Sequence, residues 1–314
     1  MAIERIVSGI RPIGNSHLGG YDEVLKNWIE LQHEHECFFF VADWHALTTH
    51  YDSPEIIEES VLEMVIDWLA AGVDPAQVTI FIQSKVPEHA ELNTLLSMIT
   101  PLSWMEKFSA HKDQQGKPSS KGLLTYGFLG YPLLQSADIL LYRATQVPLC
   151  KNQLPNIEFT RDVARRFNHL YGKEKGYEVR AEEAIKKLGS KKGHLYRDLK
   201  KSYQEGGDEQ ALESAQSLIE EQQNLSHGDK ERLLGFLEGG GKIILPEPEF
   251  HLMKNNDSLE NTLDRNSSDY KQKKQQYLDN PDLIRSVMAH GCEKARKVAK
   301  DTMRDIREVM GINF

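Results

Sequence analysis

Several features that identify whole classes of protein are absent from these 314 residues. No run of about eighteen apolar residues occurs, so the sequence predicts no membrane-spanning helix and no membrane partner. The first residues, MAIERIVSG, lack the long apolar stretch of a secretory signal, and we therefore predict a cytoplasmic protein. The three cysteines, Cys37, Cys150 and Cys292, lie far apart and match neither a disulfide framework nor a zinc spacing, so no metal site is predicted.

An excess of basic residues is absent as well. The 47 acidic residues outnumber the 38 lysines and arginines, and the net charge is −9. No overall electrostatic attraction to nucleic acid is therefore expected, although the net charge does not exclude a local basic patch. At 39% hydrophobic content, the chain is long enough to bury one large core and a smaller second one.

What the sequence does contain is an alternation of short apolar strands and amphipathic helices. The run CFFFVA at 37–42 is continuous, as is typical of strands that are buried on both faces of a parallel sheet. Further strands are predicted at 6–7, 78–82, 139–142 and 243–245, and helices at 54–69 and 88–99. Alternating units of this kind predict an α/β fold with a Rossmann-like, doubly wound parallel sheet. Ligands of such sheets bind at the carboxyl ends of the strands.

Residues 6–21, IVSGIRPIGNSHLGGY, combine a strand, a glycine-rich turn and the start of a helix. In this arrangement the backbone N–H groups and the helix dipole face an anion. Gly9, Gly19 and Gly20 would let a phosphate approach the backbone closely, and His17 at the helix entrance would stabilise its charge. The alternative is an ordinary strand-to-helix turn with a surface histidine, and the spacing alone leaves both interpretations open.

The segment SGIRPIGNSHLGGY also resembles the first signature of class I aminoacyl-tRNA synthetases, the HIGH box, in the form found in bacterial tryptophanyl-tRNA synthetases. The resemblance continues through VADWHALTTHYDSP at 41–54, KGLLTYGFLGYPLLQSADILLYRA at 121–144 and the last helix at 280–311, and it covers most of the chain. It implies a Rossmann-like catalytic domain, a homodimer, and L-tryptophan and ATP with magnesium as ligands. Segments 45–51 and 96–107 carry the large apolar residues expected at a dimer interface.

The chain divides into five predicted parts. The first part of the synthetase-like domain spans 1–172, and residues 173–238, which are charged and poor in aromatics, form a helical insertion. Residues 239–252 return to the sheet, 253–280 form a polar linker, and 281–314 form a C-terminal helix with apolar residues three and four apart. Family members place a lysine-rich KMSKS loop and most of an anticodon-reading domain where this chain has only the linker. The anticodon domain is therefore largely missing, and the sequence argues against a tRNA partner.

The resemblance implies a largely intact site for tryptophan. The carboxylate of the family's SADILLY segment accepts the indole N–H, and Asp138 stands at that position. A site built around one hydrogen bond rejects ligands that lack the donor. The other positions that match family contacts to the amino acid or its indole are Tyr131, Gln153, Val147 and Leu149. The alternative for Asp138 is a structural role, as a helix cap or as a partner of Arg143.

Two further polar residues follow the strand predicted at 37–42. Asp43 and His45 bring polar groups to its carboxyl end, and His45 is a candidate contact to the amino acid. The alternative for both is that they satisfy backbone groups where the strand ends.

The nucleotide side departs from the family in three places. Gly20 replaces the polar residue that closes the HIGH box, and the acidic turn that reaches the ATP ribose reads Cys150-Lys151-Asn152-Gln153. The KMSKS loop, whose lysines hold the departing pyrophosphate, does not follow LPEPEF at 245–250. The catalytic candidates that remain are His17 and Lys112, which matches a family lysine near the triphosphate. The degenerate nucleotide site comprises Gly9, Arg11, Gly19, Gly20, Lys151 and Asn152.

These observations favour a shortened, divergent paralogue that binds L-tryptophan or a close indole amino acid and acts in metabolite chemistry outside translation. The resemblance is to a ligase, but normal adenylation is predicted to be impaired, and the departures argue against ATP. Two alternatives stay open. One is a working ATP-dependent tryptophan–tRNA ligase, and the other is a non-catalytic tryptophan-binding sensor or partner subunit.

Overall fold

The computed structural model describes residues 4–13, 18–106, 125–149, 153–173, 176–206, 208–237, 241–253, 265 and 267–312. The chain forms two compact units. The first comprises Met1–Val163 and Glu247–Met303, and the second comprises Ala164–Pro246 and Arg304–Phe314. Helices α7 (Leu154–Tyr171) and α13 (Pro281–Met310) contribute residues to both units.

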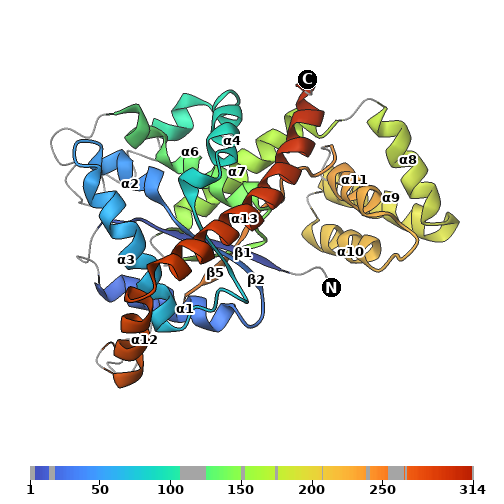
Figure 1. Ribbon diagram of the computed structural model, residues 1–314. Helices are drawn as coiled ribbons and strands as arrows, with labels where there is room; N and C mark the ends of the chain where they lie inside the picture. Colours follow the sequence, from blue (N-terminus) through green and yellow to red (C-terminus); the bar gives the residue numbers. More distant parts are fainter. Residues whose placement is uncertain are drawn as a thin grey trace. The chain divides into compact units, whose positions relative to one another are not determined.

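The first unit is built on a five-stranded sheet with the strand order β3-β2-β1-β4-β5 (Figure 1). The strands are β1 (Arg5–Ile10), β2 (Glu36–Val41), β3 (Thr79–Ile82), β4 (Gln146–Leu149) and β5 (Glu249–Leu252). The pairings that join them are all parallel. The predicted Rossmann-like, doubly wound parallel sheet is therefore confirmed, with β1 at its centre.

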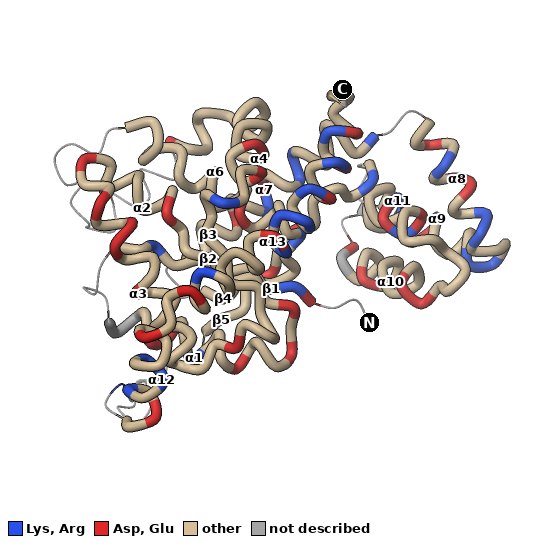
Figure 2. The backbone as a smooth tube through the Cα atoms, viewed as in Figure 1, with Lys and Arg blue, Asp and Glu red and all other residues tan. Residues whose placement is uncertain are grey.

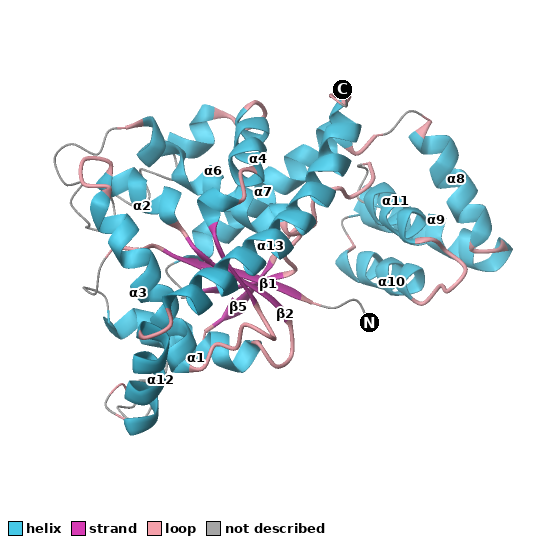
Figure 3. Ribbon diagram, in the orientation of Figure 1, coloured by secondary structure: helices cyan, strands magenta, loops and turns pink. Residues whose placement is uncertain are grey.

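Helices flank the sheet (Figure 3), and the side chains of each strand point alternately to its two faces. On one face, Phe39 of β2 stacks on Trp28 of helix α1 (Leu18–Leu31), with 4.1 Å between the ring centroids. Trp28 in turn contacts Trp68 of helix α3 (Glu55–Ala71) edge-on. On the other face, Phe38 stacks on Tyr142, which follows helix α6 (Tyr126–Leu141), at 4.9 Å. The continuous apolar run of β2 therefore serves two cores.

Among the described residues of the first unit, two glycines are required by the close approach of a neighbouring element. Gly9 lies in β1, and a Cβ atom there would collide with the ring of Phe40. The prediction that Gly9 belongs to the turn is wrong, because β1 continues to Ile10. A Cβ atom on Gly291 of α13 would collide with the backbone of Ile80, so α13 passes directly over β3 at this residue.

Two of the predicted strands are wrong. Residues 139–142 form the end of α6 and the turn after it, and the strand is β4, which begins at Gln146. A short apolar run that is buried on all sides does not distinguish a helix from a strand. Residues 243–245 are irregular, because the N–H groups of Ile244 and Leu245 donate to the side chain of Asn168 at 2.9 and 3.0 Å. The last strand is β5, which follows this segment.

The other helices of the first unit bring one further correction. Helix α3 and helix α4 (Glu88–Ser97) confirm the predictions at 54–69 and 88–99. Helix α2 (Asp43–His50) and the short 3₁₀ helix η1 (Gln83–Lys85) follow β2 and β3 and were not predicted. Within the predicted linker, residues 268–278 form helix α12 (Ser268–Leu278). This helix buries Tyr270 alone, so its sequence has no apolar periodicity to reveal it.

The second unit contains helices that surround a core of their own. They are α8 (Tyr177–Lys187), α9 (Ser190–Gly206), α10 (Glu209–Glu220) and α11 (His227–Leu237). Tyr196, Ile219 and Leu233 are fully buried in the shared core. The predicted helical character of this segment is confirmed. In the described ranges of both units, no helix is long and apolar enough to cross a membrane.

Candidate functional site

The sheet has one point at which its connectivity changes direction. From β1 the chain moves to β2 and β3 on one side, whereas β4 and β5 lie on the other side of β1. Ligands of doubly wound sheets bind outside the carboxyl ends of the strands at such a point. Gly9 and the exposed Arg11 lie at the end of β1, and the buried Val147 and Leu149 lie on β4 beside it. Four residues predicted from the sequence therefore meet here.

The α1 helix begins at Leu18, directly beyond this point, and its first turn includes Gly19 and Gly20. His17, Lys112, Lys151 and Asn152, which the sequence also assigns to the site, lie outside the described residues. The strand and the helix predicted within 6–21 are both present, and α1 follows β1, the strand at the switch between β2 and β4.

Asp138 of α6 is the centre of a buried polar network. It is 2% exposed and accepts hydrogen bonds from three side chains. Nε2 of His45 donates to Oδ2 at 2.7 Å, while Nδ1 of His89 and Nε2 of Gln83 donate to Oδ1 at 2.7 and 2.8 Å. These donors come from α2, α4 and η1, which follow β2 and β3. The structure thus joins His45 and Asp138, two residues that the sequence named separately.

The network keeps Asp138 ionised. Burial works against the charge, but His45 and His89 outweigh it and hold the pKa of this carboxyl below its usual value. Burial, with the charge of Asp138, raises the pKa of Tyr142 well above its ordinary value, so the phenol keeps its proton. Tyr142 therefore donates to Nε2 of His89 at 2.8 Å, and His89 donates from Nδ1 to Asp138.

The network has room for further donors. An ionised carboxylate offers about four acceptor positions, and Asp138 uses three of them, with a single bond at Oδ2. Oε1 of Gln83 is a second acceptor, because it is buried and has no hydrogen-bond partner among the described residues. A buried acceptor without a partner costs about 1–3 kcal/mol. This arrangement suits a ligand that brings N–H groups.

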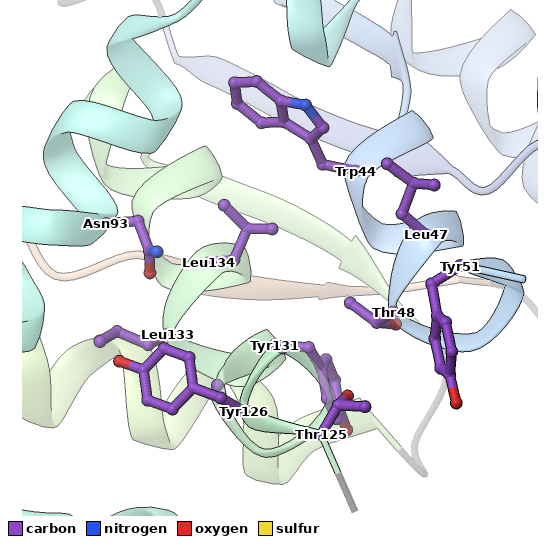
Figure 4. Close-up of a pocket in the computed structure, with 12 residues that line it drawn as sticks. Trp44, Leu47, Thr48, Tyr51, Asn93, Thr125, Tyr126, Tyr131, Leu133 and Leu134 are labelled. Atoms are coloured by element: carbon purple, nitrogen blue, oxygen red, sulfur yellow. The ribbon is translucent and has the colours of Figure 1, made fainter. Parts of the chain in front are cut away.

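A pocket of about 370 Å³ lies next to the network, between α2, α4 and the start of α6 (Figure 4). Tyr131 lines the pocket, and its ring also meets the ring of His45 edge-on at 6.5 Å between centroids. The pocket and the network therefore meet at Tyr131, although Asp138 is not part of the pocket wall. The other large side chains of the lining are Trp44, Leu47, Tyr51, Asn93, Tyr126, Leu133 and Leu134.

Two other predicted residues have simpler positions. Gln153 is exposed immediately before α7. Oδ1 of Asp43 accepts the backbone N–H of Ser84 at 3.0 Å and so joins the segments that follow β2 and β3. For Asp43 the geometry supports the structural alternative. Among the described residues, the side chains that donate to Asp138 are those of the two histidines and Gln83.

Gln83, His89 and Tyr142 complete the network, and sequence reasoning missed all three. Gln83 carries a usable signal, since it is the first polar residue after the buried strand β3. His89 lies in a helix of mixed polarity and offers none. Tyr142 follows an apolar run that the pattern assigned to a strand, which hid its place at the end of α6.

Comparisons with known proteins show what this chain resembles. Residues 4–219 match the family described as tRNA synthetases class I (W and Y). The tryptophan–tRNA ligase of Ralstonia nicotianae is 46% identical over 396 residues, which cover 99% of each chain. The tryptophan–tRNA ligase of Rickettsia bellii is 30% identical over 336 residues and 98% of each chain. These 314 residues cannot fill an alignment of 396, so the Ralstonia protein contains residues that have no counterpart here.

A solved structure is similar in fold. The tryptophanyl-tRNA synthetase from Campylobacter jejuni, crystallised in complex with ADP and tryptophan, superimposes with a TM-score of 0.63. The match covers 98% of this chain and 99% of that one, at 24% sequence identity.

Proposed function

Because this chain belongs to the class I tryptophanyl- and tyrosyl-tRNA synthetase family, we propose that it is a tryptophan–tRNA ligase that activates L-tryptophan with ATP. This proposal replaces the role outside translation predicted from the sequence, because a ligase is 46% identical over nearly the whole of both chains. The structural observation that carries it is the ionised, buried Asp138 with an acceptor position left at Oδ2.

Asp138 and its neighbours explain how one amino acid would be selected. The indole ring is apolar except for a single N–H donor, so it needs apolar walls and one acceptor. Asp138 supplies the acceptor, and its hydrogen bonds to His45, His89 and Gln83 fix the direction of the carboxylate. Val147 and Leu149 of the neighbouring β4 supply buried apolar side chains at the switch point. A ligand without the N–H donor would leave the carboxylate short of a partner.

Calorimetry with L-tryptophan tests this site. We expect saturable binding, and we expect Asp138→Asn to weaken it by about 1–3 kcal/mol, the usual cost of an unpaired buried partner. The asparagine keeps the size of the side chain, but its NH₂ group faces the N–H groups of the histidines. L-phenylalanine, which lacks the N–H, should bind on the order of tenfold more weakly or worse. Equal affinities for tryptophan and phenylalanine would contradict the proposed site.

We propose that the adenylation step is slow compared with that of an ordinary synthetase. In this step the carboxylate of tryptophan attacks the α-phosphate of ATP, and negative charge grows on the phosphoryl oxygens and on the departing pyrophosphate. Losing one preorganised donor to such charge costs about 2.7–4 kcal/mol. The sequence has no lysine-rich loop after LPEPEF at 245–250, and the acidic ribose turn is replaced by Cys150-Lys151-Asn152.

We also propose that the protein is a homodimer. Tyr51, Met98, Leu102 and Tyr126 are each more than half exposed. Tyr51 and Tyr126 line the pocket of Figure 4, and Met98 follows α4, which also contributes to its wall. Large exposed side chains of this kind on neighbouring elements are typical of a protein interface. A second copy of the chain would cover them.

A further inference from the structure

A charge cluster ties the segment around α12 to two helices of the sheet. Nε and Nη2 of Arg265 donate to Oδ1 of Asp22 in α1, at 3.1 and 2.7 Å. Nη1 of the same guanidinium donates to Oδ2 of Asp67 in α3, at 2.8 Å. Figure 2 shows charged residues on α12, which lies beside α3. One side chain therefore joins three elements that lie far apart in the sequence.

The cluster is balanced in charge and largely buried. Asp22 is 9% exposed and Asp67 is 4% exposed, so neither carboxylate is stabilised much by water. Asp67 also accepts from Nζ of Lys274 and from the hydroxyl of Tyr270, both at 2.7 Å. Two carboxylates thus face two cations. The two cations differ: among the described residues, Lys274 pairs with Asp67 and not with Asp22, whereas Arg265 pairs with both carboxylates.

Asp22, the carboxylate that Arg265 neutralises, lies close to the start of helix α1. Helix α1 begins at Leu18, so Asp22 lies about one turn from the helix end that follows β1. An unpaired carboxylate there would repel an anion at this helix end and cancel the favourable dipole. Arg265 also lies 5.4 Å from the ring centre of Tyr21, the residue before Asp22, and so holds two consecutive residues of α1.

Building on the proposed function, we infer that Arg265 is a positioning residue of the nucleotide site. It fixes the first turns of α1 and neutralises Asp22, so that the helix end can accept the triphosphate of ATP. Arg265 belongs to the segment that stands where the family has its KMSKS loop. It thereby supports the nucleotide site without touching the ATP. Tyr270 docks α12 on Asp67 of α3 and also accepts from Nη1 of Arg265 at 3.4 Å, whereas Lys274 pairs with Asp67.

Binding of ATP in the absence of tryptophan tests the inference, because no reaction can then proceed. Calorimetry is done on the unmodified protein and on Arg265→Met, Arg265→Lys, Lys274→Met and the double variant Asp22→Asn/Arg265→Met. We expect Arg265→Met to weaken ATP binding about tenfold or more. Arg265→Lys keeps the charge and should retain most of the affinity. The double variant removes both charges and should restore it as well.

Lys274→Met is the matched control, because it removes a cation from the same cluster without exposing Asp22. It should lower stability but leave the affinity for ATP within about twofold, and L-tryptophan should bind all the variants equally. Equal affinity for ATP in Arg265→Met and the unmodified protein would overturn this inference and leave the proposed function standing. So would equal losses in Arg265→Met and Lys274→Met, or a failure of the double variant to recover. No binding of ATP by the unmodified protein would overturn the inference and the adenylation step of the proposed function together.

Discussion

Among single residues, Asp138 shows how a buried charge is kept. A carboxylate that is 2% exposed loses nearly all of its hydration, and only close donors can offset that loss. His45, His89 and Gln83 supply them, each from a different element. Tyr142 does not contact Asp138 but donates to Nε2 of His89. The proton of His89 is therefore on Nδ1, which donates to Asp138. The orientation of the carboxylate therefore depends on a residue that does not touch it.

Tyr142→Phe tests this chain of donors. Without the hydroxyl, Nε2 of His89 loses its partner, and the proton on Nδ1 is no longer fixed. We expect tryptophan to bind roughly fivefold more weakly, about 1 kcal/mol, the typical net worth of one hydrogen bond. Tyr196→Phe is the control, since Tyr196 is equally buried but donates to the carbonyl of Leu233 in the second unit. Tyr196→Phe should lose comparable stability and keep its affinity for tryptophan. Equal losses of tryptophan affinity in Tyr142→Phe and Tyr196→Phe would refute the role of Tyr142 in orienting His89.

The sequence led to His45 and Asp138 through their match to a known motif, but it did not lead to the contact between them. That contact depends on α2 and α6 lying on the same side of the sheet, and the residues are separated by more than 90 positions. Gln83 and His89 reach the same carboxylate from η1 and α4. Polar networks of this kind are assembled by topology, and single-sequence patterns carry little information about them.

Among the elements, α12 is held by charge as well as by the packing of Tyr277 against the core. Burial works against the ionised form of Asp67, but Lys274, Tyr270 and Arg265 outweigh it and place its pKa below the ordinary value of 3.8. A pKa that is lowered in the folded state adds stability above the ordinary value, and that stability is lost as the pH falls toward the native pKa. The docking of α12 should therefore weaken in acid.

Lys274→Met tests the acid sensitivity. At neutral pH the variant should unfold at lower urea than the unmodified protein, and the difference should shrink as the pH falls below about 4. Tryptophan fluorescence is a suitable probe, because Trp28, Trp44, Trp68 and Trp104 all belong to the first unit. Lys273→Met removes an exposed pair with Asp269 and should change little. A difference between Lys274→Met and the unmodified protein that stays constant from pH 7 to pH 3 would be evidence against this account.

The same elements mark what periodicity can and cannot predict. The strand β2 and the helix α3 were predicted because they bury long apolar stripes. The end of α6 was mistaken for a strand because it is buried all round, and α12 was mistaken for a linker because it buries Tyr270 alone. In α12 the signal was local instead: the hydroxyl of Ser267 caps the helix by accepting the N–H of Tyr270.

For the whole molecule, the exposed apolar residues around the pocket predict a dimer. Met98→Asp places a charge on a side chain that is 71% exposed, so it should fold normally but oppose association. Light scattering should give about twice 35.9 kDa for the unmodified protein and a mass closer to 35.9 kDa for the variant. Val179→Asp on α8, at a side chain that is 63% exposed, is the control and should leave the mass unchanged. A monomer mass for the unmodified protein at all micromolar concentrations would exclude the dimer.

The central claim is that this chain is a tryptophan–tRNA ligase, and the most direct test is the charging of purified tryptophan tRNA with labelled L-tryptophan. We predict that label enters the tRNA only when ATP is present. The rate should be roughly a hundred- to a thousandfold below that of an ordinary tryptophan ligase assayed alongside, because no lysine-rich loop follows LPEPEF at 245–250 in the sequence. Asp138→Asn should lower it further. If no tRNA is charged at concentrations at which tryptophan and ATP both bind, the protein is not a ligase and the account is contradicted.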